Sequence, residues 1–592
     1  MKRRSTVSTT AIGERSKAPA HGAGSLRTSR TEGSRVVEPS NSSRRRASQR
    51  PPSARSGGRA WRRSGIGAGV ALLVVAGGAP GAAVPASASV TTWYAYARGE
   101  ARSPTSCPET GTASRQCTLS EALSKATAGS SVDLASSGQA GVYVGNWTVS
   151  TPGTTSSAPL MIRPAPGTSQ TTLGGNGGQS AGCGTGTCDG PVLTIGPKVH
   201  VDIEGVTIRH ADNTTAAGLG GAIENIHGGT VTVSRSTFLD NYASADGGAI
   251  DNADITGTGT LIVSGSTFLG NYAENDDGGA IANADVDGHG TVIVSGSTFS
   301  GNSAINGDGG AIDNGDTRGN GRLVVSGSMF LGNVAARAGA IDNADNARGT
   351  LSVTNSTFTG NVSAVDDAGA IDNADWSGTG TLIVSGSTFS GNKTIGDGGA
   401  IDNADNLATS RGTLMVSTST FSGNIADVHG GAIDNADFGG TGTAVVSAST
   451  FSGNSANNIY ADNGALGGGV IATGTNSTVW VVADIFNGPC LQAGGTWEDE
   501  GYNVGSNRSC LGRATGDVGH GANRLGPLAY NGGPTKTFLP LEGNPAIDAI
   551  PYRTKVTLYR RPVDVCPVTD QRGVPTASRR SCTAGAVQLP GR

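Results

Sequence analysis

The chain has 592 residues and a formal net charge of −4, and 95 of its residues are glycine. Sixteen of the 42 Lys and Arg residues lie in the first 63 positions, so the remainder holds 26 basic and 43 acidic residues and a charge near −17. A remainder this acidic argues against nucleic acid and anionic membranes as partners.

The N-terminal 88 residues have the features of an export leader. Residues 1–63 are basic and rich in Ser, Pro and Gly, and an apolar run of small residues follows from Gly65 to Ala83. The run ends near Ala86-Ser87-Ala88, as a secretory signal does before its cleavage site. We therefore predict a leader and signal over 1–88 and an extracellular or cell-surface protein. The alternative is a retained membrane anchor, for which the run is barely long enough.

Residues 89–200 are predicted to start the fold with a cap and the first irregular coils. The stretch from Thr118 to Glu121 is a capping box, and Leu119, Ala122 and Leu123 form an apolar stripe. We expect a short helix over 118–128 to lie across the first coil and cover its open strand edges.

The stretch 201–486 consists of regular repeats. Each copy has a Ser-Thr-Phe-x-Gly-Asn phrase and, about ten residues later, a Gly-Gly-Ala-Ile-Asp-Asn-Ala-Asp phrase. A fixed period of this length is the signature of a solenoid. The phenylalanines are Phe238, Phe268, Phe299, Phe330, Phe358, Phe389, Phe421 and Phe451.

The repeats predict β-structure. Leu261 and Val263 alternate along a short run, as on one face of a strand, and Gly, Asn, Asp and Ser break each copy into about three strands and three turns. This predicts an all-β fold, a right-handed parallel β-helix with about 31 residues per coil. Like residues then stack along the axis. Phe and Ile would form the core, and an Asn column would line a turn at Asn271, Asn302, Asn333, Asn361, Asn392, Asn424 and Asn454.

The two short motifs, Phe-x-x-Asn and Gly-Gly-Ala-Ile, resemble the repeats of the polymorphic outer-membrane protein family. The passenger domains of that family are right-handed β-helices. The resemblance implies the same fold here and a place on a surface, and it implies no particular activity.

Residues 487–592 leave the period. Leu525-Gly526-Pro527, Gly543-Asn544-Pro545-Ala546-Ile547-Asp548 and the run from Cys566 to Gly573 resemble the choice-of-anchor Q domain, a module that ends many secreted β-helices. The sequence departs from that family at Cys582-Thr583-Ala584. The resemblance implies a module that closes the end of the solenoid, with loops linked by Cys566 and Cys582.

The eight cysteines lie outside the regular repeats. With an export signal, an even and clustered set favours disulfides over free thiols. Zinc is the alternative, but no pair has Cys-x-x-Cys spacing and histidines are scarce. Pairing of nearest neighbours predicts Cys107–Cys117, Cys183–Cys188, Cys490–Cys510 and Cys566–Cys582.

Aspartates recur in two slots of the repeat, and we expect the first column to point outward. Stacked carboxylates about 5 Å apart repel by roughly 1 kcal/mol per neighbour in a water-like dielectric. Calcium could bridge them, or they could cap turns and keep the rod soluble; both interpretations stay open. The first column is Asp251, Asp313, Asp342, Asp372, Asp402 and Asp434. The second is Asp254, Asp285, Asp316, Asp345, Asp375, Asp405 and Asp437.

An aliphatic residue also lies between the two core-facing aliphatic positions. Alternation places it outside, and an exposed apolar stripe several coils long usually marks a contact surface for a ligand or for self-association. A covering loop, the C-terminal module or β-propensity alone would explain it equally well. The stripe is Ile262, Ile293, Val324, Ile383, Met415 and Val445.

These features favour a secreted, non-catalytic binding or adhesion rod for an extracellular glycan or protein. The alternatives are a polysaccharide lyase or hydrolase and a self-assembling structural protein. No catalytic residue is assigned, because the unusual side chains of the repeats have no evident pairing and are expected to be loop residues. They are His227, His289, Arg337, Trp376 and His429.

Overall fold

A computed structural model describes residues 91–97, 117–136, 140–168, 170–175, 189–215, 217–405, 408–436, 439–457, 468–558, 561–576 and 580–589. The predicted leader and signal, together with Cys107, Cys183, Cys188 and Asp437, lie outside the described residues. Within these ranges, no helix is both long enough and apolar enough to cross a membrane.

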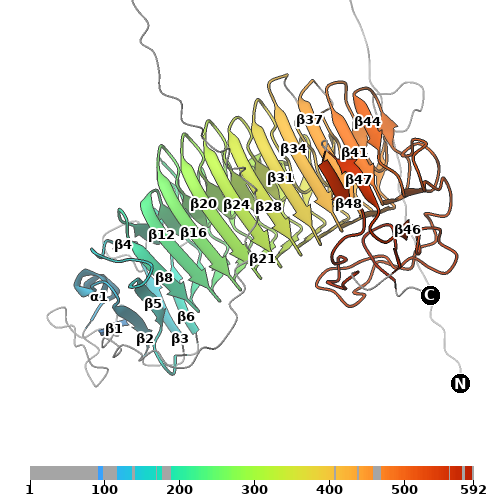
Figure 1. Cartoon of the computed structure of the whole chain (residues 1–592). Coiled ribbons are helices and arrows are strands. Elements are labelled where there is room, and N and C mark those ends of the chain that lie inside the picture. Colours follow the sequence, from blue (N-terminus) through green and yellow to red (C-terminus); the bar gives the residue numbers. More distant parts are fainter. Residues whose placement is uncertain are drawn as a thin grey trace, which may run out of the picture. The chain divides into compact units, whose positions relative to one another are not determined.

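The chain folds as an all-β parallel solenoid of about ten coils with about 31 residues each, as predicted. One coil consists of β15 (Ile250–Asn252), β16 (Thr258–Ser264), β17 (Thr267–Leu269) and β18 (Tyr272–Ala273). Each strand pairs in parallel with its counterpart in the next coil, which gives the row of parallel arrows in Figure 1. The sequence predicted three strands per coil and missed β18, which has only two residues. The direction of winding stays a prediction.

Four long parallel sheets result among the described residues, and three of them position the candidate sites. The long sheet contains β1 (Thr92–Tyr96), β2 (Ser131–Ala135), β5 (Leu160–Pro164), β8 (His200–Glu204), β12 (His227–Ser234), β16, β20 (His289–Ser295), β24 (Asn320–Ser326), β28 (Arg348–Thr354), β31 (Thr379–Ser385), β34 (Arg411–Ser417), β37 (Thr441–Ser447), β41 (Thr478–Val482) and β44 (Thr496–Asp499). The Phe sheet contains β3 (Ala140–Val144), β6 (Gln170–Gly174), β9 (Thr207–Arg209), β13 (Thr237–Leu239), β17, β21 (Thr298–Ser300), β25 (Met329–Leu331), β29 (Thr357–Thr359), β32 (Thr388–Ser390), β35 (Thr420–Ser422), β38 (Thr450–Ser452), β42 (Ile485–Asn487) and β45 (Val504–Gly505). The Ile sheet contains β4 (Trp147–Val149), β7 (Leu193–Ile195), β11 (Ile223–Asn225), β15, β19 (Ile281–Asn283), β23 (Ile312–Asn314) and β27 (Ile341–Asn343).

The core is a set of columns of identical side chains. Phe268 pairs in register with Phe299, and their ring centroids are 4.6 Å apart with planes 4° from parallel. The same stacking continues without a gap from Phe238 to Phe451, and every one of these rings is buried. The predicted Phe column is therefore confirmed, and it extends the apolar core along the whole repeat region.

The predicted Asn column is confirmed as well. Asn271 Nδ2 donates to Asn302 Oδ1 at 2.8 Å, and its backbone N–H donates to the same oxygen at 3.1 Å. A second amide ladder runs through the Ile sheet, where Asn252 Nδ2 donates to Asn283 Oδ1 at 2.7 Å. Each side-chain amide thus forms a hydrogen bond with the next one in the ladder, so burying these polar groups costs little free energy.

Helix α1 (Leu119–Lys125) forms where the sequence places it. The Thr118 side chain accepts from the Glu121 backbone N–H, the Glu121 carboxylate accepts from the Thr118 backbone N–H, and Leu119, Ala122 and Leu123 are buried. The helix packs against β1 and β2. Its role as a cap for the first coil stays a prediction.

Part of the C-terminal segment lies where the sequence did not place it, because it folds back along the side of the Phe sheet. Closure of the end of the stack, which the resemblance implied, stays a prediction. Gln571 Nε2 donates to Ser387 O at 3.1 Å and to Thr388 Oγ1 at 2.9 Å. Its hairpin, β47 (Lys555–Leu558) with β48 (Arg561–Asp564), lies beside β37 and β41 in Figure 1. A segment outside the period gives no register from which its docking coil could be read.

Candidate metal centre and exposed faces

The first aspartate column is buried, so the expectation that it faces solvent is wrong. Asp251, Asp313 and Asp402 are fully buried. The cause is a third acidic column, in the slot before each Gly-Gly pair, which the sequence analysis missed. The turns on both sides of each Ile strand fold over the first column and bring their own acids with them.

The third column is Asp246, Asp277, Asp308, Asp367 and Asp397. In four of the five, one oxygen accepts a hydrogen bond from a backbone N–H of the next coil. For example, the Asp277 N–H donates to Asp246 Oδ1 at 3.0 Å, and the Asp397 N–H donates to Asp367 Oδ1 at 2.7 Å. The glycines keep this turn tight, since a Cβ on Gly248 would lie 2.3 Å from the Gly279 carbonyl oxygen. The signal that could have revealed the column is the recurrence of Asp before Gly-Gly-Ala-Ile.

Among the described residues, four groups of carboxylates have ligand oxygens that all lie within 4.8 Å of one another. Calcium takes oxygen ligands at about 2.3–2.6 Å, so oxygens around one ion are separated by up to about twice that distance. The groups are Asp246 with Asp276 and Asp277, Asp246 with Asp254 and Asp285, Asp277 with Asp285 and Asp316, and Asp367 with Asp402 and Asp405.

Several carboxylate oxygens in and beside these groups accept no hydrogen bond within the described residues. They include both carboxylate oxygens of Asp313, Oδ1 of Asp285 and Oδ2 of Asp402. Burial, followed by the charge of neighbouring aspartates, raises the pKa of all three well above its usual value. A buried carboxylate needs a counter-charge or a proton, because an uncompensated charge is costly.

Arg337 supplies such a counter-charge at one level. It occupies the slot of the third column, and its Nε and Nη2 atoms lie 2.9 and 2.5 Å from the two carboxylate oxygens of Asp308. Its Nη2 is also 3.7 Å from Asp345, and its guanidinium lies over the Trp376 ring at 5.5 Å. The side chain enters the acidic columns from β26 (Val334–Arg337).

His429 occupies the same slot two coils after Asp367, and its Nδ1 is 3.2 Å from Asp397 Oδ1. The expectation of loop residues is wrong for Arg337, which is the last residue of β26, and correct for Trp376 and His429, which lie between strands. The pairing of Arg337 with Trp376 was not evident from the sequence. The expectation of loop residues is also wrong for His227 and His289, which are the exposed first residues of β12 and β20.

The aliphatic stripe forms one register column of the long sheet. Ile262 pairs with Ile293, Ile293 with Val324, and Ile383 with Met415. Ile383 is 41% and Met415 40% exposed. Val445, at the C-terminal end, packs against the buried cluster that contains the hairpin residue Leu558, so the C-terminal segment covers that end of the stripe. The remainder stays open.

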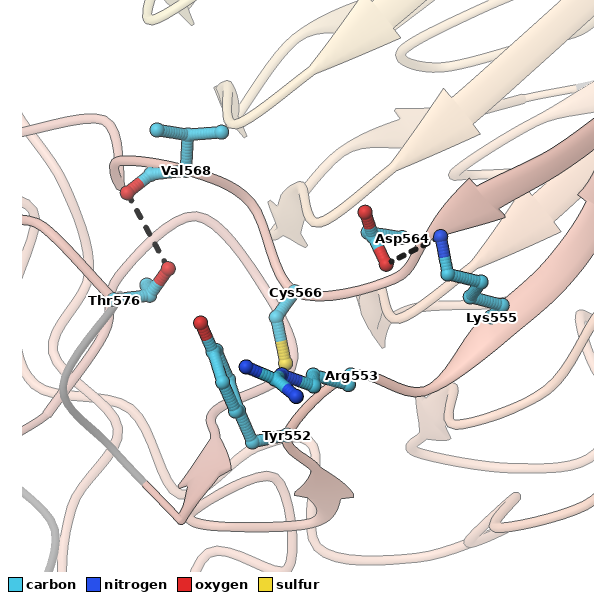
Figure 2. Close-up of a pocket in the computed structure, with 7 residues that line it drawn as sticks. All are labelled: Tyr552, Arg553, Lys555, Asp564, Cys566, Val568 and Thr576. Carbon is cyan, nitrogen blue, oxygen red and sulfur yellow. Dashed lines mark hydrogen bonds and ion pairs between the residues drawn. The ribbon is translucent and has the colours of Figure 1, made fainter.

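A pocket of about 340 Å³ lies in the C-terminal segment and was not predicted from the sequence. Figure 2 shows Tyr552 and Arg553 beside each other in it, with the guanidinium 5.7 Å from the ring centre. Lys555 and Asp564 form an ion pair of 3.2 Å at its edge. The described residues that line the pocket form no group of converging acids or bases.

Disulfides link Cys490 with Cys510 and Cys566 with Cys582. Cys117 is also disulfide-bonded. The pairings predicted for Cys107 and for Cys183 with Cys188 involve residues outside the described ranges.

Comparison with known proteins identifies two copies of the repeat as similar to a known repeat family. The Chlamydia polymorphic membrane protein (Chlamydia_PMP) repeat matches residues 386–404 and 418–436, each of which runs from a Phe-x-Gly-Asn phrase to the following Ile-Asp-Asn-Ala. Among solved structures, the alginate lyase from Paenibacillus sp. str. FPU-7 is similar, with 14% identity and a TM-score of 0.29 over 61% of this chain and 95% of that one. No curated protein matches the chain significantly.

Proposed function

We propose that this chain is a non-catalytic binding rod displayed on a cell surface or released from it. The open part of the aliphatic stripe carries the proposal. It is a column of aliphatic side chains on the long sheet, interrupted once by Ser352, and it is flanked on the same face by Thr381 and Ser385 and their counterparts in neighbouring coils. Exposed apolar patches of this regularity usually mark contact surfaces. The likeness of the repeats to those of polymorphic membrane proteins supports a surface location.

The chemistry of the stripe favours a protein partner over a glycan. Aliphatic side chains bury apolar protein surface well, whereas Ile and Val offer few of the hydrogen bonds that sugar hydroxyls need. The rod would present the same contact in successive coils, so weak contacts add up through avidity. A glycan ligand and contact between two copies of this chain are the competing outcomes.

A carbohydrate lyase or hydrolase is the second candidate from the sequence, and the site gives it little support. The clustered carboxylates lie largely inside the turns rather than on an open face, and a polysaccharide must reach its catalytic acid and base. Polymer cleavage by the purified chain would therefore contradict the binding-rod proposal.

The test measures binding of the full chain to arrayed extracellular proteins and glycans, with a parallel assay for reducing ends and unsaturated products. The double variant Ile383→Asp with Met415→Asp places two charges in the stripe. We expect at least a tenfold loss of protein binding. Leu269→Asp is the matched control, since Leu269 is 42% exposed on the Phe sheet, and it should bind as the unmodified chain does. Equal binding by the double variant and the control would contradict the role of the stripe.

A further inference from the structure

The acidic columns divide into two blocks. The first block contains six carboxylates from consecutive coils, in three groups that share members: Asp246, Asp277 and Asp285 each belong to two groups. The second block contains Asp367, Asp402 and Asp405. Between the blocks lies the level of Arg337, where none of the four groups is found.

We propose that each block binds divalent cations of the calcium class, and that Arg337 is a built-in cation that replaces them at the level between the blocks. This proposal does not depend on the proposed binding function. Every candidate ligand in the blocks is a carboxylate oxygen, which suits calcium and disfavours zinc. The ligands come from turns of adjacent coils, so a bound ion would link the coils along the axis.

Asp285 is the central observation for the first block. Its side chain is only 2% exposed, its Oδ1 atom accepts no hydrogen bond within the described residues, and it belongs to two of the groups. An oxygen in this position needs either a proton or a cation. Asp402 has the same role in the second block, since its Oδ1 accepts from the Asn403 N–H and its Oδ2 accepts no hydrogen bond from any described residue.

The surroundings of Arg337 bear on the choice between a proton and a cation. Where a cationic side chain can reach the columns, it makes two short hydrogen bonds to Asp308 and approaches Asp345. The acidic columns therefore accommodate a positive charge at that level. The first block also has a route for ions to enter, because Asp276 is exposed and Asp316 is partly exposed.

The first experiment uses the full chain, freed of metal with EDTA and then dialysed to equilibrium against calcium chloride. Extracellular calcium sites bind in the range of about 0.1–1 mM, so free calcium is set at about 2 mM. We expect at least one bound ion per block and a higher melting temperature in calcium than in EDTA. No bound calcium, with equal melting in both buffers, would overturn the proposal and leave a protonated aspartate ladder.

Single-residue variants test which block binds each calcium ion. Asp285→Asn and Asp402→Asn should each lose about one calcium equivalent and much of the calcium-dependent rise in melting temperature. Both should fold in EDTA, because each removes a buried carboxylate of which one oxygen accepts no hydrogen bond within the described residues. Asp240→Asn is the control: it removes an exposed carboxylate outside the blocks and should bind calcium as the unmodified chain does. Full calcium binding by both block variants would overturn the assignment.

Arg337→Gln tests the built-in cation. If Arg337 replaces a metal ion, the variant should be less stable in EDTA, bind additional calcium and regain stability when calcium is present. A purely structural ion pair would instead give the same loss of stability in both buffers and no additional calcium. That second result would overturn the role assigned to Arg337.

Discussion

At the scale of single residues, the repeat is stable because buried polar side chains form hydrogen bonds with the equivalent residue of the next coil. The Ser266 N–H donates to Ser297 Oγ at 3.1 Å, and the Ser266 hydroxyl donates to Ser264 O at 2.9 Å. This Ser column ends at Asp484, which takes the Ser slot. The Ser449 and Val482 N–H groups donate to its two carboxylate oxygens at 2.7 and 3.2 Å.

Asp484 makes stability depend on pH. Burial raises the pKa of its carboxyl well above the usual value, although the two N–H donors act in the opposite direction. The folded state then binds a proton that the unfolded state releases, so this contribution to stability is complete below about pH 4 and is lost as the pH rises. Asp484→Ser restores the column hydroxyl. We expect the difference in free energy of unfolding, variant minus unmodified chain, to increase as the pH rises above 4. The increase should be at most about 1.4 kcal/mol per pH unit.

Urea unfolding of both proteins at pH 4.5 and 7.5 checks this expectation. Asp202→Ser, a partly exposed position in β8, is the control and should show a much smaller change of the difference with pH. A difference between Asp484→Ser and the unmodified chain that is the same at both pH values would contradict the role given to Asp484.

At the scale of elements, the strands are short and gain their stability from stacking rather than from length. β21 has three residues, yet Phe299 on it is covered by a ring on each side, at centroid distances of 4.6 and 4.9 Å. An aromatic pair that is offset or stacked adds to the burial of apolar area. The Phe column therefore carries much of the cooperativity between coils.

Phe299→Ala should lower the free energy of unfolding by about 3–5 kcal/mol, because it leaves a cavity between two rings that cannot close up. Guanidinium unfolding followed by circular dichroism measures it. Ile305→Ala is the control in the same coil: Ile305 is 43% exposed, and its loss should cost no more than about 0.5 kcal/mol. Equal effects of the two variants would mean that the column does not hold the coils together.

Periodicity explains which part of this fold could be predicted. A strict period states which residues share a column, so the coil, the Phe column and the Asn271 ladder follow from the sequence. It does not state whether a turn folds over its neighbour, so Asp251 was expected in solvent and is buried. The third acidic column was harder to recognise because Arg337 and His429 replace its aspartate in two coils.

At the scale of the whole molecule, the regular solenoid and the non-periodic C-terminal segment meet at polar contacts. Gln571 is almost fully buried and lies at the centre of them. Its Oε1 accepts from Thr420 Oγ1 at 2.6 Å, while its Nε2 donates to Thr388, to Ser387 and, within the segment, to Thr535 Oγ1 at 2.9 Å. One amide thus connects two coils to the segment.

Gln571→Ala should release the C-terminal segment before the solenoid unfolds. The substitution removes these hydrogen bonds and leaves the buried Thr420 hydroxyl without its acceptor, which costs about 1–3 kcal/mol. Limited proteolysis should then cut within 519–589 several times faster, while the coils that carry the Phe column stay intact. Gln492→Ala, at an exposed position that bonds only to Ser509 O in the described structure, should leave the cleavage rate unchanged. If the cleavage rates of Gln571→Ala and the unmodified chain are equal, the segment is held by its apolar contacts with Val445 and Trp480 instead.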